Sequence, residues 1–184
     1  ASATNKIYVL IPFGSLEQFA GLPAKLDGDS EYQSAAADFM NRSKNNAPYE
    51  KIDSSLLIAM TGMPQLALPP STAEKAPWIF ELRTYYSPTE AKGANKIEMF
   101  NAGEVEVMKE IGLNPVFFAG TIAGPKMPNL IYMTSGPNMD EYRKIWRAFG
   151  PHPVWKKLST DAKYKDNMTG IQSVFLRRTE ASQI

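Results

Sequence analysis

The C-terminal part of the chain alternates between strand-like and helix-like patterns of hydrophobic and polar positions. Four of its segments are apolar runs, rich in aromatic and β-branched residues and bounded by turn residues. These predicted strands are residues 78–86, 116–124, 129–135 and 171–179. Runs such as "VFFAGTI" are apolar at successive positions, so we expect helices to cover one face of the sheet and a second sheet to cover the other.

Helical spacing fills the two long intervals between these strands. The first helix is expected to begin with Ser87 as its N-cap and Glu90 as the capping-box partner, and to end near Gly112. Asn138 is expected to cap the second helix, and a further helical segment is expected over 153–164. One face of the second helix carries Tyr142, Ile145, Trp146 and Phe149. The order β-α-β-β-α-β predicts a complete ferredoxin-like α+β domain over residues 78–184.

The N-terminal part of the chain, residues 1–62, repeats half of this pattern. An apolar run, a helical region and a second apolar run predict a strand-helix-strand unit. These elements are expected over residues 6–13, 15–40 and 54–62. The segment 63–77 contains four prolines, so we expect an extended linker there between the two copies.

An internal alignment supports a tandem repeat whose first copy is incomplete. "NKIYVL" at 5–10 matches "NLIYMT" at 129–134, and Asp29 falls opposite His152. The first copy lacks its first strand, which in a ferredoxin-like sheet lies between the third and fourth strands. A vacancy there would leave backbone hydrogen-bonding groups unpaired. We therefore expect either that the chain is part of a longer protein or that another segment fills the vacancy.

Composition excludes several classes of function. The chain has 20 basic and 19 acidic residues and no marked basic run, so nothing favours a nucleic-acid surface. It has no cysteine and one histidine, which excludes disulfides, thiolate nucleophiles and a multi-histidine metal site within one chain. No segment approaches the ~20 apolar residues of a membrane span. We therefore expect no metal site, no nucleic-acid partner and no membrane span, and the catalytic residues stay unassigned.

Several motifs together resemble the NIPSNAP family. They are "FELRTYYSPTEAK", "GLNPVFFAGTIAGP", "NLIYMTS" and the tryptophan of "HPVWKKL". The resemblance covers residues 79–179 and extends over 5–62 as an incomplete second copy, as in tandem-domain bacterial members. It implies a dimeric α+β barrel, in which ferredoxin-like units pack sheet against sheet between two chains or between the two repeats. It also favours an exported, periplasmic protein after signal removal, with a cytoplasmic location as the alternative.

The resemblance implies no defined reaction. Family members are linked to protein partners, and structural relatives include cofactor-free monooxygenases and haem-degrading enzymes, so the fold leaves the function open. We expect self-association, or binding of a protein partner or a small apolar ligand, without a resident cofactor. The alternative is a small cofactor-free or haem-related oxygenase or isomerase that uses the cleft between sheet and helices.

His152 is the only histidine and precedes a proline at the start of a predicted helix. Family members usually have Asp-Pro-x-Trp where this chain has His152-Pro153-Val154-Trp155, and Asp29 stands at the same place in the repeat. Both observations favour an N-cap, in which a ring nitrogen accepts a hydrogen bond from a backbone N–H. The alternative is a haem ligand or general base at the mouth of the barrel.

Glu81, Arg83 and Tyr85 alternate with other residues and share one face of the first predicted strand. The simplest interpretation is a Glu–Arg lattice that stabilises the sheet. The alternative is a pocket wall between sheet and helices, in which Arg83 holds an acidic group of a ligand. The candidate ligand-binding residues are Arg83, Tyr85, Tyr132, His152 and Arg177.

Overall fold

The computed structural model describes residues 6–74 and 76–184. Contacts between residues divide the chain into two units, one up to Ile52 and the other from Asp53 to Ile184. Within the described residues, all strands and all buried side chains belong to the second unit. The second unit therefore contains the hydrophobic core.

An antiparallel sheet forms the centre of the second unit. Its strands are β1 (Leu56–Ala59), β2 (Ile79–Tyr86), β3 (Pro115–Ala123), β4 (Asn129–Gly136) and β5 (Gly170–Leu176). Their spatial order is β1-β3-β4-β2-β5, and every neighbouring pair is antiparallel. Without β1, this is the order of a ferredoxin-like sheet, so the predicted α+β fold is confirmed for this region.

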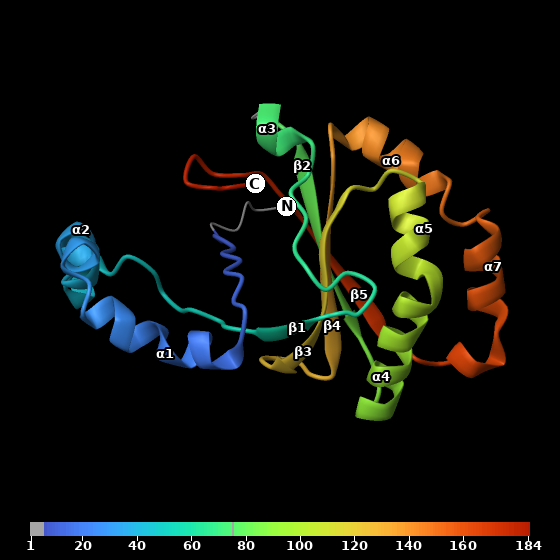
Figure 1. Ribbon diagram of the computed structural model, residues 1–184, viewed down its shortest axis with the longest axis horizontal. Helices are drawn as coiled ribbons and strands as arrows, with labels where there is room; N and C mark the ends of the chain where they lie inside the picture. The colour runs from blue at the N-terminus through green and yellow to red at the C-terminus, as the bar shows by residue number, and fades with distance from the viewer. Residues whose placement is uncertain (1–5, 75) are drawn as a thin grey trace. The chain divides into compact units, whose positions relative to one another are not determined.

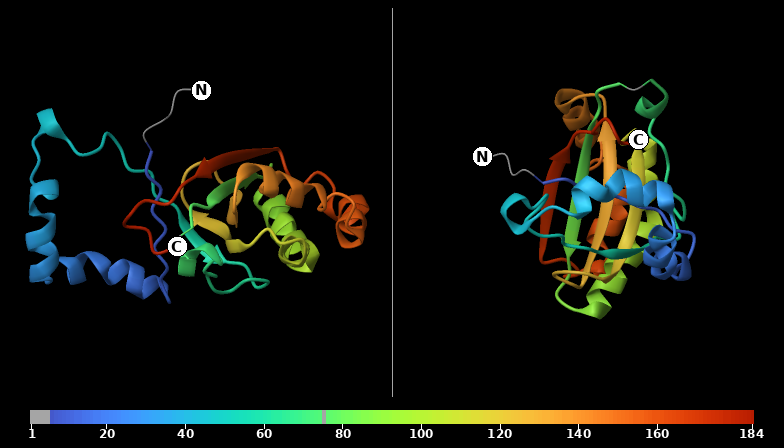
Figure 2. Two further views of the ribbon diagram at one scale, coloured as in Figure 1. Left: turned by 90° about the horizontal axis from the view of Figure 1, so that it is seen from above. Right: turned by 90° about the vertical axis from the view of Figure 1, so that its left-hand side faces the viewer.

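Helices fill both crossovers between the strands. They are α4 (Glu90–Met99), the π-helix η2 (Phe100–Glu104) and α5 (Val105–Glu110) after β2, and α6 (Met139–Arg147), α7 (Pro153–Thr160) and η3 (Ala162–Tyr164) after β4. Figure 1 shows α4 to α7 on one face of the sheet, and the right-hand view of Figure 2 looks onto the opposite face. No helix within the described ranges is long and apolar enough to cross a membrane.

The first crossover helix differs from its prediction at both its start and its middle. Thr89, not Ser87, is the N-cap, and its hydroxyl accepts a hydrogen bond from the backbone N–H of Lys92. A π-helical turn interrupts the helix at Gly103, where φ is 158°. A Cβ at this position would lie 2.6 Å from a methyl carbon of Val154, so only glycine allows α7 to approach this closely.

The predicted linker over 63–77 is part of the second unit. Met63 is buried in the main core, and the backbone N–H of Ala67 donates to the carbonyl oxygen of Val116 on β3. Ser71–Glu74 form the short helix α3. The prolines suggested a free segment, but apolar side chains between them anchor it to the domain.

The predicted strand over 54–62 forms as β1, but its partner is not in the first copy. β1 pairs with β3, so it extends the sheet of the second unit. The expected boundary at 62 is therefore placed after Ile52 in the structure. The exposed edge of β3 offered backbone partners that the first copy did not.

The first unit contains helices and no sheet among its described residues. Its elements are α1 (Leu16–Asp27), α2 (Ser30–Met40) and η1 (Lys44–Asn46). The predicted helical region 15–40 is thus divided into two helices, α1 and α2. Asp29 caps α2, because its carboxylate accepts from the backbone N–H of Tyr32. The predicted strand over 6–13 does not form, and Ile7 there is 81% exposed. A strand needs a neighbour to pair its backbone, and the described residues give this segment none.

Candidate functional site

Strand alternation turns one side of β2 toward the helices. Glu81, Arg83 and Tyr85 lie on this side, as the sequence predicts, and Tyr132 of β4 is paired with Arg83 across the sheet. The hydroxyl oxygens of Tyr85 and Tyr132 are 3.0 Å apart, and Arg83 Nη1 donates to the Tyr132 hydroxyl at 3.5 Å. Three of the five candidate ligand-binding residues therefore meet in space.

Tyr85 and Tyr132 belong to the hydrophobic core. Both are buried, and their rings pack with Phe100 and Phe118 at centroid distances of 5.1–5.8 Å. Burial is the main cause that raises the pKa of each tyrosine, so both hydroxyls are neutral. A neutral, enclosed phenol cannot act as a base on a ligand.

Glu81 is a buried carboxylate that accepts from several side chains. The Tyr142 hydroxyl donates to its Oε2 at 2.6 Å, the Ser173 hydroxyl donates to its Oε1, and Arg83 Nε lies 2.9 Å from Oε1. Burial, followed by the Glu81 charge, raises the pKa of Tyr142, so this phenol is also protonated. The predicted Glu–Arg pair exists, and tyrosine and serine hydroxyls hold its carboxylate in place.

Two N–H groups beside this carboxylate lack hydrogen-bond acceptors within the described part of the chain. They are Arg83 Nε and Trp146 Nε1, and both are buried. Arg83 Nε is in ion-pair distance of Glu81, but the N–H is not directed as in a hydrogen bond. The Trp146 N–H lies close enough to the Tyr142 hydroxyl to lower its pKa, but the contact lacks the geometry of a well-directed hydrogen bond. The Arg83 guanidinium lies over the Trp146 ring, 4.0 Å from its centroid.

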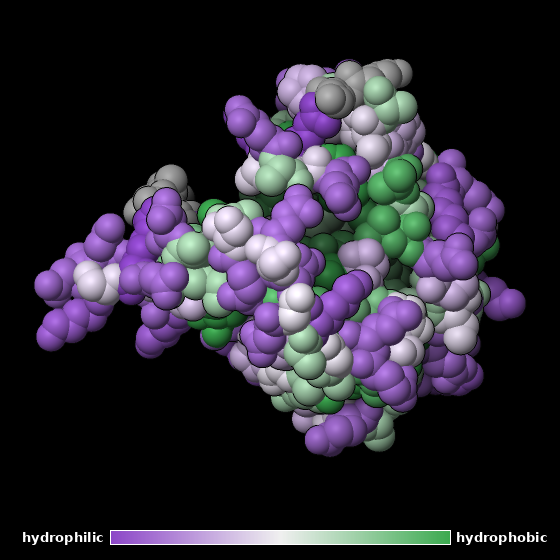
Figure 3. Space-filling view, turned by 60° about the vertical axis from the view of Figure 1, so that its left-hand side comes forward, coloured by the Kyte–Doolittle hydropathy of each residue, from purple (hydrophilic) through white to green (hydrophobic). Residues whose placement is uncertain are grey.

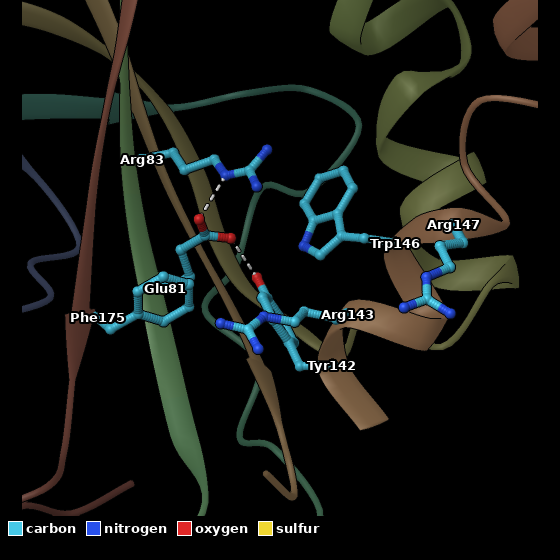
Figure 4. Close-up of a pocket in the computed structure, with 7 residues that line it drawn as sticks. All are labelled: Glu81, Arg83, Tyr142, Arg143, Trp146, Arg147 and Phe175. Carbon is cyan, nitrogen blue, oxygen red and sulfur yellow. Dashed lines mark hydrogen bonds and ion pairs between the residues drawn. The ribbon is translucent and has the colours of Figure 1, made fainter. Parts of the chain in front are cut away.

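An open depression of about 410 Å³ lies beside these groups, between β2, β5 and α6, and is called here the β2–α6 pocket. Its lining residues are Glu81, Arg83, Tyr142, Arg143, Trp146, Arg147 and Phe175. Figure 4 shows Arg83 and Glu81 rising from β2 toward Trp146 and Tyr142 of α6. The volume is in the lower part of the range typical of small-molecule sites.

The mouth of the β2–α6 pocket is basic. Arg143 and Arg147 are exposed and stand one helical turn apart on α6. Arg143 has a weak contact with Asp140, at 3.9 Å, and Arg147 makes no hydrogen bond or ion pair with any described residue. Three arginines and one glutamate give the lining a formal charge of +2.

His152 and Arg177 do not line the β2–α6 pocket. His152 is the N-cap of α7: its Nδ1 accepts from the backbone N–H of Val154, which confirms the predicted capping role. Its Nε2 is 3.0 Å from a carboxylate oxygen of Glu110, so the proton lies on Nε2 and is donated to Glu110. Arg177 follows the end of β5 and is exposed.

The residues that the sequence did not indicate come from α6 and β5. Tyr142 and Trp146 were expected on one face of the second helix, and Tyr142 is buried, but both also line the pocket. The sequence did contain a signal, because Arg143 directly follows Tyr142 and Arg147 directly follows Trp146. The two arginines are therefore four residues apart on the helix, like the two aromatic residues. Without the position of β5, nothing in the sequence placed Phe175 opposite them.

A second polar pair, on α4 and η2, is enclosed by protein. Lys96 Nζ of α4 is 2.5 Å from Glu104 Oε1, and both side chains are at most 5% exposed. The ammonium also lies within 6 Å of the ring centroids of Tyr85, Phe100 and Trp155. Burial raises the pKa of Glu104, and Lys96 opposes this shift.

No cluster of side chains that could hold a metal ion occurs within residues 6–74 and 76–184.

Comparison with solved structures supports an α+β protein of ferredoxin-like topology. A NIPSNAP family protein from Agrobacterium tumefaciens has a TM-score of 0.52 at 15% identity, with 59% of this chain and 91% of that chain covered. A second protein of the family from the same species, of unknown function, has a TM-score of 0.51 at 14% identity, covering 57% and 91%. A NIPSNAP-like domain protein from Burkholderia xenovorans has a TM-score of 0.50 at 11% identity, covering 57% and 88%.

The sequence profile of the NIPSNAP family matches residues 80–183, which is more than half of the chain. The protein therefore belongs to the NIPSNAP family, and the resemblance seen in its motifs is confirmed. No curated protein matches the chain significantly. The matched region contains the whole β2–α6 pocket but not the first unit.

Proposed function

We propose that this NIPSNAP family protein binds a small organic ligand in the β2–α6 pocket. The observation that carries the proposal is a pair of buried N–H groups, on Arg83 and Trp146, that have no well-directed acceptor and belong to residues lining one cavity. A buried donor without a partner is unfavourable by about 1–3 kcal/mol, which applies to Trp146, whereas the Arg83 charge is already paired with Glu81 at 2.9 Å. A ligand oxygen that accepts from either group would recover part of this energy, which an apolar ligand could not do.

Binding is better supported than catalysis. The hydroxyl of Tyr142 is protonated, and Glu81 already accepts from two hydroxyls and faces an arginine. The lining residues therefore present no free general base. The expected alternative, an oxygenase or isomerase, would need a reacting group that a bound substrate or cofactor supplies.

A haem group does not fit His152 as its ligand. One ring nitrogen caps α7 and the other donates to Glu110, so neither is available to iron without breaking a contact. A haem ligated by His152 is therefore not part of the proposal.

Trp146→Phe tests ligand binding, because it removes the N–H group and keeps an aromatic ring. Small oxygen-containing organic molecules would be screened by ligand-observed NMR against the natural protein and the variant. We expect some molecules to bind the natural protein at millimolar concentration or better and to bind the variant several-fold more weakly. Hits that bind both proteins equally, or the absence of hits, would reject the proposal.

Self-association is the second candidate function, and the sheet face opposite the helices supports it. Phe80, Val116 and Met133 are buried on this side of the molecule, while Leu82 and Phe117 beside them are only partly covered. Hydrophobic surface, in green, is visible in Figure 3, which is turned toward this side of the sheet. Packing of two such faces would give the sheet-on-sheet arrangement of an α+β barrel.

Light scattering on the natural protein and on Phe117→Asp tests this second candidate. We expect a dimer for the natural chain and a monomer for the variant, because a buried carboxylate opposes sheet packing. A monomeric natural chain at about 100 μM, well above the dissociation constant of a stable dimer, would contradict it.

A further inference from the structure

The pocket holds two kinds of positive group, at two depths. Arg83 lies at the bottom, with a side chain that is 20% exposed and a partner in Glu81. Arg143 and Arg147 lie on α6 at the mouth and are exposed. The charge at the bottom is balanced by Glu81, whereas the charge at the mouth is not balanced by any lining residue.

This distribution separates two parts of a ligand. At the bottom, an anionic group would meet the Glu81 carboxylate, whose Oε1 is only 2.9 Å from the Arg83 Nε that the ligand must reach. Two carboxylates so close repel each other, so the group that accepts from Arg83 and Trp146 is uncharged. A carbonyl or ether oxygen meets this condition.

At the mouth the requirement is the opposite. Arg147 has no partner among the described residues, and the Arg143–Asp140 contact is long, at 3.9 Å. A guanidinium pairs well with a carboxylate, which it can bind through two N–H groups. Trp146 and Phe175 add apolar surface to the lining.

We infer that the ligand is an organic acid with two oxygen functions: an uncharged acceptor that binds Arg83 and Trp146, and a carboxylate that binds Arg143 and Arg147. Keto acids and N-acylated amino acids belong to this class. The inference rests on the proposed function, because it specifies the ligand of the same pocket.

N-acetylphenylalanine is a suitable probe, and its primary amide is the matched uncharged probe. Both contain an acyl oxygen and an aromatic body, and only the acid contains a carboxylate. We expect the acid to bind about fivefold more tightly than the amide at low salt, which is the effect of roughly 1 kcal/mol from ion pairs at an exposed mouth. The difference in affinity should shrink at 0.5 M salt, where the Debye length is about threefold to fourfold shorter than at 0.05 M.

Three variants of the protein test the two ends of the ligand separately. Arg143→Gln with Arg147→Gln should abolish the preference for the acid and leave binding of the amide unchanged. Lys144→Gln is the matched control, since Lys144 is on the same helix, pairs with Glu141 and does not line the pocket. It should leave the preference intact. Trp146→Phe should weaken both probes by the same factor.

The outcomes separate this inference from the proposed function. If acid and amide bind equally and Trp146→Phe weakens both, the pocket binds ligands but the inference is wrong. If the double arginine variant retains the preference for the acid, the inference is also wrong. Binding that saturates only above about 10 mM is very weak. If neither probe shows saturable binding up to that concentration, both the inference and the proposed function are rejected for these ligands.

Discussion

Two ion pairs lie on the helix-covered side of the sheet, and they differ in how completely they are enclosed. Lys96 and Glu104 are both nearly inaccessible, and three aromatic rings surround the ammonium. Arg83 and Glu81 border an open depression of about 410 Å³ and leave an N–H group without a well-directed acceptor. The same kind of ion pair is thus enclosed in one place and open to solvent in the other, and only the open pair is part of the proposed ligand site.

The closed pair spans the irregular part of the first crossover helix. Glu104 belongs to the π-helical turn, and Lys96 lies in the regular helix before it. Their contact joins the two sides of the turn, next to Gly103 where α7 approaches. Buried ion pairs add little net stability, but removal of one partner leaves an uncompensated charge. This asymmetry allows the comparison of the two pairs to be tested.

Lys96→Ala should produce the largest effect. It leaves the Glu104 carboxylate buried without its partner, so we expect the free energy of unfolding to fall by about 3–5 kcal/mol. Denaturation in urea, followed by tryptophan fluorescence, measures the loss. The combined variant Lys96→Met and Glu104→Leu should recover most of it, because no charge is then left in the core.

Lys109→Ala is the control for this experiment. Lys109 pairs with Glu106 on the surface, with both side chains more than a third exposed, so its loss should cost at most about 1 kcal/mol. If Lys96→Ala and Lys109→Ala had equal effects, the Lys96–Glu104 pair would be in contact with water and the proposed contrast would fail.

Glu81→Gln should have an intermediate effect on stability. The amide keeps an acceptor oxygen for the Tyr142 or Ser173 hydroxyl but removes the charge that faces Arg83. Because hydrogen bonds to charged groups contribute about 1.5–3 kcal/mol, we expect a loss in that range, measured by the same denaturation. Arg83 can still be solvated through the pocket. A loss as large as that of Lys96→Ala would show that the second pair is equally closed.

Glu104 should also give the stability a distinct pH dependence. Burial raises its pKa in the folded protein above the ordinary value of 4.5, so folding favours the protonated form. Its contribution to stability is then complete below the unfolded pKa and is lost as pH rises through the raised pKa, with a slope of at most about 1.4 kcal/mol per pH unit. The difference in unfolding free energy between the natural protein and Glu104→Gln, measured from pH 4 upward, should show this decline. A difference that grows with pH would contradict it.

The sequence was sufficient for the order of elements over residues 78–184 because the signals there are local. Strand composition, the glycine at 112 and the asparagine at 138 specify elements and their ends, and the order of elements then restricts the sheet topology. The N-cap at His152 was predictable for the same reason, since a cap depends on its nearest neighbours in the chain.

Features that depend on distant partners could not be obtained in this way. The apolar pattern over 6–13 is compatible with a strand, but a strand also needs a paired neighbour. The face shared by Glu81 and Arg83 was predictable from alternation, whereas the pocket also requires the register of β5 and the rotation of α6. Relative register is a property of tertiary packing, so only the structure shows that Trp146 and Phe175 line the pocket.

His152→Asp should produce the smallest effect, and it isolates the cap from any role in binding. Aspartate is a strong N-cap, as Asp29 shows in α2, and its charge favours the positive end of the helix. Against this gain, the new carboxylate faces Glu110 in place of the donor Nε2. We expect the two terms to cancel within about 0.5 kcal/mol, whereas His152→Ala should lose about 1 kcal/mol of helix capping. Both variants should bind the organic-acid probe as the natural protein does, because His152 does not line the β2–α6 pocket. A clear loss of probe binding in His152→Asp, with stability unchanged, would show that the imidazole has a function beyond the cap.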